Sequence, residues 1–296
     1  MRIRYALAIT IAAAAVSPLS GQSMGRAFVD DLAWAGRDFG AIWLSPFTGE
    51  PPNYLITGAV LSGGAFASAW DVQVDAWAVR NYDRGLLRAL SPVRRGGRLY
   101  TLNKATPYVG AAYVIALATN QRGFRDGVMG CASAYAAGSS IRHLVVYPLI
   151  GRDRPDTVRD RPEGTVGPAA KRGDQYRFQL PSDGWPTHSF PGGHVATMAT
   201  CASFFAHRYD AKYIDPALIV LVTAMGVGRI ADRGHWLSDQ LIGIAMGYAI
   251  GKEVARRQLK RLDEERESAA ANGDVPVPLP DAAQGRRTLI GWRISF

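Results

Sequence analysis

This sequence has little cysteine, little lysine and no basic run that would mark a nucleic-acid surface. Its 296 residues include two cysteines, Cys131 and Cys201, which lie in apolar segments without the close spacing of metal ligands. We expect the two cysteines to be buried free thiols. A disulfide between them is the alternative if the protein is exported. The net charge of +9 comes mainly from scattered arginines. The composition therefore excludes a cysteine metal site and a nucleic-acid partner, and it favours an anionic partner such as a phosphate ester.

The apolar segments 127–141, 217–228 and 241–251 are short for membrane spans, which need about 20 apolar residues. Segments of this length are typical of core helices, so the sequence favours a soluble bundle. Helices rich in glycine and alanine that pack inside a membrane would give a similar pattern. A membrane-embedded bundle is therefore the alternative.

Residues 1–23 have the three parts of a secretory signal peptide. Two arginines lie near the start, residues 6–16 are apolar, and residues 17–23 are small or polar. The pattern predicts a periplasmic or otherwise exported protein. An uncleaved anchor helix is the alternative interpretation.

Helical spacing and apolar composition predict one helical domain over residues 24–262. The expected helices lie within 25–47, 54–79, 84–100, 107–119, 127–141, 195–207, 217–228 and 241–251. The fold class is all-α, a compact helical bundle with its site where helix ends converge. Residues 156–186 form a long polar loop, which is typical of a functional mouth or lid. Residues 263–296 are expected to be a flexible linker and tail, with a short terminal strand over 288–296.

The stretch 226–239 holds polar residues at the junction of two apolar segments. His235 and Asp239 are four residues apart, so on a helix they share a face and the carboxylate can fix the tautomer of the imidazole. Arg229, six residues before His235, can reach an anion held against it. This set suits nucleophilic attack on a phosphoryl group. For this stretch alone, a solvent-exposed helix junction with a surface ion pair is an equally good interpretation.

Two further clusters also lie at helix ends. Gly192 and Gly193 precede a helix, where backbone N–H groups and the helix dipole form an anion nest, and His194 follows them. Arg154 and Pro155 follow another apolar segment. Helix ends that converge would bring the three clusters into one anion pocket.

The clusters 147–155, 191–194 and 228–239 resemble, in order and spacing, three motifs of the type 2 phosphatidic acid phosphatase superfamily. That family includes bacterial acid phosphatases, lipid phosphatases and vanadium haloperoxidases. Its motifs are Lys, six residues, Arg-Pro; then Pro-Ser-Gly-His; then Ser-Arg, five residues, His, three residues, Asp. The resemblance covers residues 127–252.

The resemblance implies a role for each matching residue. His235 attacks phosphorus to form a phosphohistidine, and Asp239 orients it. His194 protonates the leaving group and later activates water. The phosphoryl oxygens are held by Arg154, Arg229 and the Gly193 backbone. No metal or cofactor is implied.

Three positions depart from the family pattern. Tyr147 fills the lysine position, while Gly192 and Gly228 replace the two serines. Losing one electrostatic donor costs about a hundred- to a thousandfold in rate, so Tyr147→Lys is expected to raise turnover. Arg152 lies two residues before Arg154 in an extended stretch and is expected to point the same way and to compensate.

The sequence thus predicts an exported phosphatase acting on a lipid phosphate or a small soluble ester, with membrane-surface association as one option. Vanadate-dependent haloperoxidase and a weakly catalytic phosphate-binding descendant are the alternatives. Asp71 and Asp75 are expected to pair with arginines rather than to catalyse. The sequence does not indicate an oligomeric state.

Overall fold

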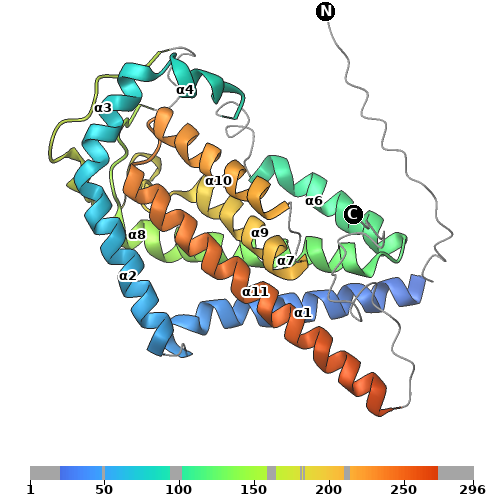
Figure 1. The fold of residues 1–296 in the computed structure, drawn as a ribbon. Helices are drawn as coiled ribbons and strands as arrows, with labels where there is room; N and C mark the ends of the chain where they lie inside the picture. The colour runs from blue at the N-terminus through green and yellow to red at the C-terminus, as the bar shows by residue number, and fades with distance from the viewer. Residues whose placement is uncertain are drawn as a thin grey trace, which may run out of the picture.

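The computed structural model describes residues 21–48, 51–93, 102–158, 165–180, 182, 184–209 and 214–272. The α-helices are α1 (Gly21–Thr48), α2 (Pro51–Ala67), α3 (Asp71–Asn81), α4 (Gly85–Ala89), α6 (Leu102–Ala118), α7 (Arg122–Ile141), α8 (Tyr147–Ile150), α9 (Gly193–Tyr209), α10 (Ile214–Ala231) and α11 (Leu237–Ala271). Short turns are η1 (Ser68–Trp70), η2 (Arg142–Val146, a π-helix), η3 (Asp174–Tyr176) and η4 (Trp185–Thr187). In this part of the chain no β-strand forms, which confirms the predicted all-α class (Figure 1).

Most of the expected helices lie where the sequence places them. The expected helix 54–79 is divided into α2, η1 and α3, and residues 94–100 of the expected segment 84–100 lie outside the described residues. One helix extends past its expected end. α11 runs to Ala271, past the expected boundary at 262. Charged pairs one turn apart line this extension, such as Arg266 with Asp263 at 2.9 Å, and such pairs stabilise helices. Most of the predicted signal peptide and the whole predicted terminal strand lie outside the described residues.

Helices α9 and α11 form the closest pair in the bundle, and α7 and α10 also pack on α9 (Figure 1). Glycines at every fourth position of α11 make this approach feasible. A Cβ at Gly247 or Gly251 would overlap the carbonyl oxygen of Ala196 or Thr200 in α9. These glycines therefore allow close packing of the two helices whose first turns carry His194 and Asp239.

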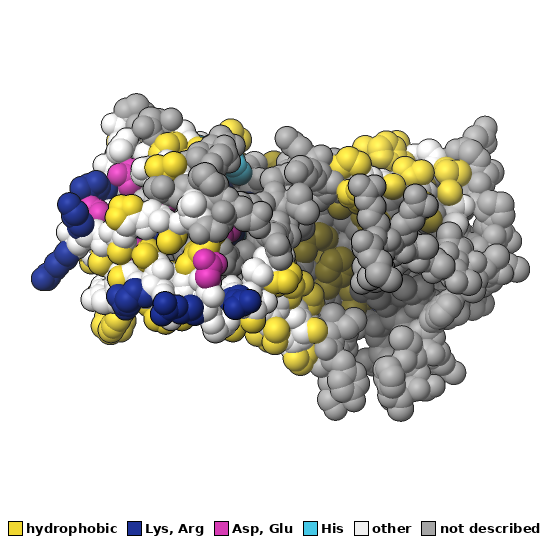
Figure 2. Space-filling view, turned by 90° about the horizontal axis from the view of Figure 1, so that it is seen from above, with side chains coloured by type: hydrophobic (Ala, Val, Ile, Leu, Met, Phe, Trp, Pro, Cys, Tyr) yellow, Lys and Arg dark blue, Asp and Glu magenta, His cyan; other side chains and the backbone are white. Residues whose placement is uncertain are grey.

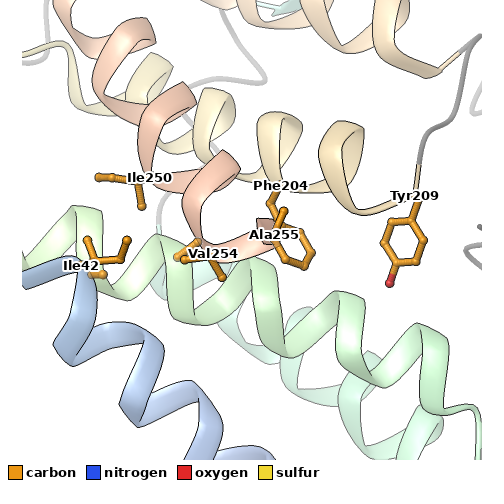
Figure 3. Packing of buried hydrophobic residues seen from close by; sticks show 8 residues of the cluster. Ile42, Phe204, Tyr209, Ile250, Val254 and Ala255 are labelled. Atoms are coloured by element: carbon orange, nitrogen blue, oxygen red, sulfur yellow. The ribbon is translucent and has the colours of Figure 1, made fainter. Parts of the chain in front are cut away.

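A buried cluster ties α1, α7, α9 and α11 together. Figure 3 shows Ile42 of α1 and Phe204 of α9 around Ile250 and Val254 of α11. Phe204 and Val254 are fully buried. Burying each such side chain contributes about 1.5–3 kcal/mol, so this cluster fixes the angle between the helices that carry the site.

The two cysteines form a disulfide, which corrects the expectation of two buried thiols. Cys131 of α7 and Cys201 of α9 have their Cα atoms 5.0 Å apart. Each sits in an apolar helix, and the packing of α7 on α9 brings them face to face. The sequence showed their positions but not this contact.

One described segment has the length and composition of a membrane span. Leu55–Asn81 is apolar on average, and 17% of its most apolar window is buried. This segment is not one of the three apolar segments that the sequence marks as too short to span a membrane. Large hydrophobic side chains are exposed here on Leu55, Ile56, Leu61, Phe66 and Trp70. Figure 2 shows hydrophobic side chains over much of the described face, with Lys and Arg gathered at one end.

Candidate active site

Helix ends converge on one side of the bundle, as the sequence predicts. The first turns of α9 and α11 meet the last turn of α10 and the short α8. Arg152, Arg154 and Ser189, from the connection between α8 and α9, contact the residues at the start of α11. Helix α3 packs on α10, α11 and η3 at the same place (Figure 1). The three motif clusters therefore lie together, each at a helix end.

His235 lies just before α11 and is 2% exposed. Its Nδ1 is 2.7 Å from the carbonyl oxygen of Ser189. A carbonyl only accepts, so Nδ1 carries the proton and Nε2 carries the lone pair. Nη1 of Arg154 is 3.5 Å from Nε2. Burial lowers the pKa of His235 well below its usual value, and the charges of Arg154 and Arg229 lower it further, so the imidazole is neutral.

Asp239 does not bind His235 directly, which corrects the sequence interpretation. Its Oδ2 accepts from Ser189 Oγ at 2.5 Å and from the Trp236 amide at 2.9 Å, and its Oδ1 accepts from Arg152 at 2.5 Å. Helix α11 begins at Leu237, so His235 precedes the helix and the two residues do not share a helical face. Asp239 thus fixes Ser189, and the Ser189 carbonyl fixes His235.

Arg152 does not line the pocket, so the predicted compensation for the missing lysine is wrong. Its Nη2 binds Asp71 at 2.7 Å, and its Nη1 binds Ser238 at 2.8 Å together with Asp239. Its Nε donates to the Gln175 carbonyl at 2.9 Å. With every nitrogen occupied and 3% exposure, Arg152 is a structural cation.

The prediction that Asp71 and Asp75 pair with arginines is confirmed. Asp75 binds Arg233 at 2.7 Å, in parallel with the Asp71–Arg152 pair. These two ion pairs attach α3 to the loop after α8 and to the turn before His235.

His194 lies in the first turn of α9 and faces His235. The two ring centroids are 6.4 Å apart and the ring planes are inclined at 65°. Burial lowers the pKa of His194 to about 3, with further lowering by Arg229, Arg154 and Arg142. Without an anion in the pocket, both imidazoles are therefore neutral.

Arg154 and Arg229 approach the same point beside His235. Arg154 donates to the carbonyl oxygens of Gly234 and, at 2.8 Å, His188, and its guanidinium stacks 4.5 Å above Trp185. A Cβ at Gly234 would overlap Nη2 of Arg229 and lie 3.4 Å from Nη1 of Arg154. Only glycine leaves room for both guanidinium groups next to the imidazole.

The glycine nest and Tyr147 lie together at the start of α9. A Cβ at Gly193 would be 2.6 Å from the Tyr147 hydroxyl, which donates to the Pro191 carbonyl at 3.3 Å. The amide of Gly192 donates to the Asp239 carbonyl at 2.9 Å, so this donor is used within the protein rather than in an anion nest. Tyr147 is 5% exposed and stacks on His188 with centroids 4.7 Å apart.

Sequence reasoning missed one residue near the nest. Arg142, in the π-helical turn η2, is 2% exposed, and its charge acts on His194. No motif marks it. An arginine inside an otherwise apolar helical segment was the available signal. As for metals, the described ranges contain no group of three or more His, Cys, Asp or Glu side chains suited to an ion.

These features bring two facing imidazoles and two arginines together at converging helix ends of an all-α bundle. The model of the PAP2 superfamily matches residues 127–263, from α7 into α11. Lipid A 1-phosphatase of Porphyromonas gingivalis is 35% identical over 81 residues, which are 26% of this chain and 18% of that protein. This chain therefore aligns with less than a fifth of that relative. No solved structure matches the chain.

Proposed function

We propose that this protein is a phosphatase that hydrolyses a lipid phosphate monoester through a phosphohistidine on His235. The observation that carries the proposal is the pair of facing, buried imidazoles, of which His235 is held in one tautomer by the Ser189 carbonyl. The match of residues 127–263 to the PAP2 superfamily model supports the same chemistry.

In the first step, Nε2 of His235 attacks phosphorus and the bond to the ester oxygen breaks. His194 gives its proton to the leaving alkoxide, so the products are an alcohol and a phosphoenzyme. His194 then takes a proton from water, and the hydroxide attacks the phosphohistidine to release phosphate and free His235. Each group returns to its starting protonation state.

Substrate binding solves the protonation problem that the lowered pKa of His194 poses. Burial and three arginine charges lower the pKa of His194 to about 3, which leaves no proton to donate near neutral pH. A phosphate dianion neutralises those charges and stabilises an adjacent imidazolium. His194 therefore gains its proton when the substrate arrives, while His235, bound to Ser189 through Nδ1, keeps its lone pair for attack.

A lipid substrate and an exported location are supported by separate features. The relative from P. gingivalis is named for action on lipid A. Large hydrophobic side chains are exposed on α2, α6 and α10, including Phe66, Tyr108 and Val220, and such surfaces suit contact with a bilayer. The Cys131–Cys201 disulfide favours an oxidising compartment outside the cytoplasm.

The test compares lipid and soluble esters with the purified full chain in mixed micelles. Phosphatidic acid in micelles should be hydrolysed with a higher kcat/KM than p-nitrophenyl phosphate. His235→Ala should abolish phosphate release from both. The matched control is His207→Ala, a change at the opposite end of α9, which should retain activity. Equal activity in His235→Ala and the control would refute the nucleophile, and a preference for the soluble ester would refute the lipid substrate.

A further inference from the structure

Arg142 is buried and differs in its partners from three other buried arginines. Arg125, Arg152 and Arg233 each bind a buried carboxylate. Arg142 has no carboxylate within ion-pair distance among the described residues. Its Nη2 donates to Thr197 at 3.1 Å, while its Nε and Nη1 have no hydrogen-bond acceptor there. A buried guanidinium with two unused donor nitrogens is costly unless an anion comes to it.

The π-helical turn η2 explains where this side chain points. The Tyr147 amide donates to the Arg142 carbonyl, one π-turn back. In a regular α-helix, residues five apart point about 140° away from each other. The wider π-turn brings them into line, and single π-turns are frequent at functional sites. Arg142 and Tyr147 therefore lie on the same side of the chain.

That side faces the start of α9. The position of a Cβ on Gly193 would be 3.9 Å from Arg142 Nε and 2.6 Å from the Tyr147 hydroxyl. Thr197, which accepts from Arg142, is in the first turn of the same helix and donates to the Gly193 carbonyl at 3.0 Å. The guanidinium, the phenol and the helix N-terminus thus meet next to His194, at the pocket where an anion is attracted.

We propose that Arg142 is the third phosphoryl-binding cation of this site and, with the Tyr147 hydroxyl, takes the place of the lysine in the family's first motif. The proposal rests on the proposed function for the identity of the anion. Nε of Arg142 donates to a phosphoryl oxygen, and the Tyr147 hydroxyl donates to the same oxygen after leaving the long contact with Pro191. The third charge comes from a residue five positions earlier than the motif predicts.

The assignment reverses one expectation from the sequence. Replacing Tyr147 by lysine was expected to restore a missing cation. Next to Arg142, however, a lysine ammonium would meet a like charge in a buried place and would remove the phenol donor. We therefore expect Tyr147→Lys to lower turnover of an aryl phosphate in a folded protein, and a rise in turnover would overturn the proposal.

The direct test measures binding of inorganic phosphate to the full chain by isothermal titration. Arg142→Gln removes the charge and keeps most of the volume. It should weaken phosphate binding about ten- to a hundredfold, because a hydrogen bond to a charged group is lost. Arg142→Lys should fall between Arg142→Gln and the wild type. The matched control is Arg208→Gln, a buried arginine at the far end of α9 that binds Gln258 at 2.6 Å, and it should leave the affinity unchanged.

A second readout separates binding from a structural role. The charge of Arg142 helps to lower the pKa of His194. Arg142→Gln should therefore raise that pKa in an NMR titration, whereas Arg208→Gln should not. A phosphate affinity that stays at its wild-type value in folded Arg142→Gln would overturn the proposal, and an unchanged His194 pKa would show that the Arg142 charge does not act on the site.

Two further outcomes are informative. If Arg142→Gln does not fold, the Nε–H signal of Arg142 in the wild-type protein should shift on adding phosphate, and an unchanged signal at saturation would overturn the assignment. If the wild type binds phosphate with this dependence on Arg142 but hydrolyses no ester, the assignment stands and the proposed function fails. If the wild type hydrolyses esters but Arg142→Gln binds phosphate with wild-type affinity, the proposed function stands and the assignment of Arg142 fails.

Discussion

Arg142 and Arg152 are both buried within the same motif region, yet they have opposite surroundings. Arg152 binds the carboxylates of Asp71 and Asp239, and all its nitrogens are occupied. Arg142 binds one hydroxyl, on Thr197, and two of its nitrogens have no acceptor in the described structure. A neutralised arginine holds the framework in place, whereas an arginine without a carboxylate attracts an anion. The partners of Arg142 and Arg152 therefore distinguish the roles of these two buried cations.

Removing Arg152, whose charge is neutralised by carboxylates, should have the largest effect on stability. Arg152→Met leaves the carboxylates of Asp71 and Asp239 buried without their cation. We expect a loss of about 3–5 kcal/mol in the free energy of unfolding, measured by urea denaturation in micelles. Arg142→Gln, which leaves no carboxylate uncompensated, should cost clearly less. Equal losses for the two variants would erase the distinction between them.

The disulfide offers a perturbation away from both arginines. Replacing Cys131 and Cys201 by serine removes a cross-link between α7 and α9 that spans 70 residues of sequence. The free energy of unfolding should fall by about 2–4 kcal/mol. Phosphate affinity at a temperature where the variant is folded should be unchanged, since the pocket residues are untouched. A large change in affinity would show that the link also shapes the pocket.

Gly192→Ser tests whether the pocket tolerates the residue that the family carries. The new Cβ would lie 2.9 Å from Gln240 Oε1 and 3.1 Å from the Asp239 carbonyl oxygen. We expect a loss of about 1–3 kcal/mol through overpacking, together with lower turnover. Without this crowding, one added hydroxyl would instead give a small gain through one hydrogen bond. Higher turnover without loss of stability would favour that simpler view.

Acid sensitivity is a further expected effect, and its sign follows from the lowered pKa of His194 and His235. Between about pH 6.5 and 3 the unfolded chain binds protons that the folded His194 does not bind. The free energy of unfolding should therefore fall as the pH falls through this range, by up to about 1.4 kcal/mol per pH unit for each histidine. His194→Gln should flatten the dependence. Identical slopes in the two proteins would contradict the assigned pKa.

The sequence predicts most of the fold and the membership of the site, because motifs and helix periodicity are local. The convergence of helix ends and the pairing of Asp71 and Asp75 with arginines follow from such patterns. What it misses depends on where a helix starts or how it winds. Helix α11 begins after His235, which directs Asp239 to Ser189, and the π-turn rotates Arg142 toward Tyr147. Neither the start of α11 nor the π-turn can be predicted from residue spacing.

The sequence does not predict two other features, for a different reason. They are the contact between Cys131 and Cys201 and the exposure of residues 55–81. Both depend on which helix faces pack together, and apolar small-residue helices look alike whether they are buried or exposed. Only the packing of α7 on α9 and the open outer face of α2 distinguish the two cases.

The central claim is that His235 becomes phosphorylated during turnover. Rapid quenching of the full chain with a phosphate-labelled phosphatidic acid, under alkaline conditions that preserve phosphohistidine, followed by peptide mass spectrometry, tests this directly. We predict label on His235, with more label accumulating in His194→Gln because water is no longer activated efficiently. Label on another residue, or no label in a protein that turns over the substrate, would contradict the account.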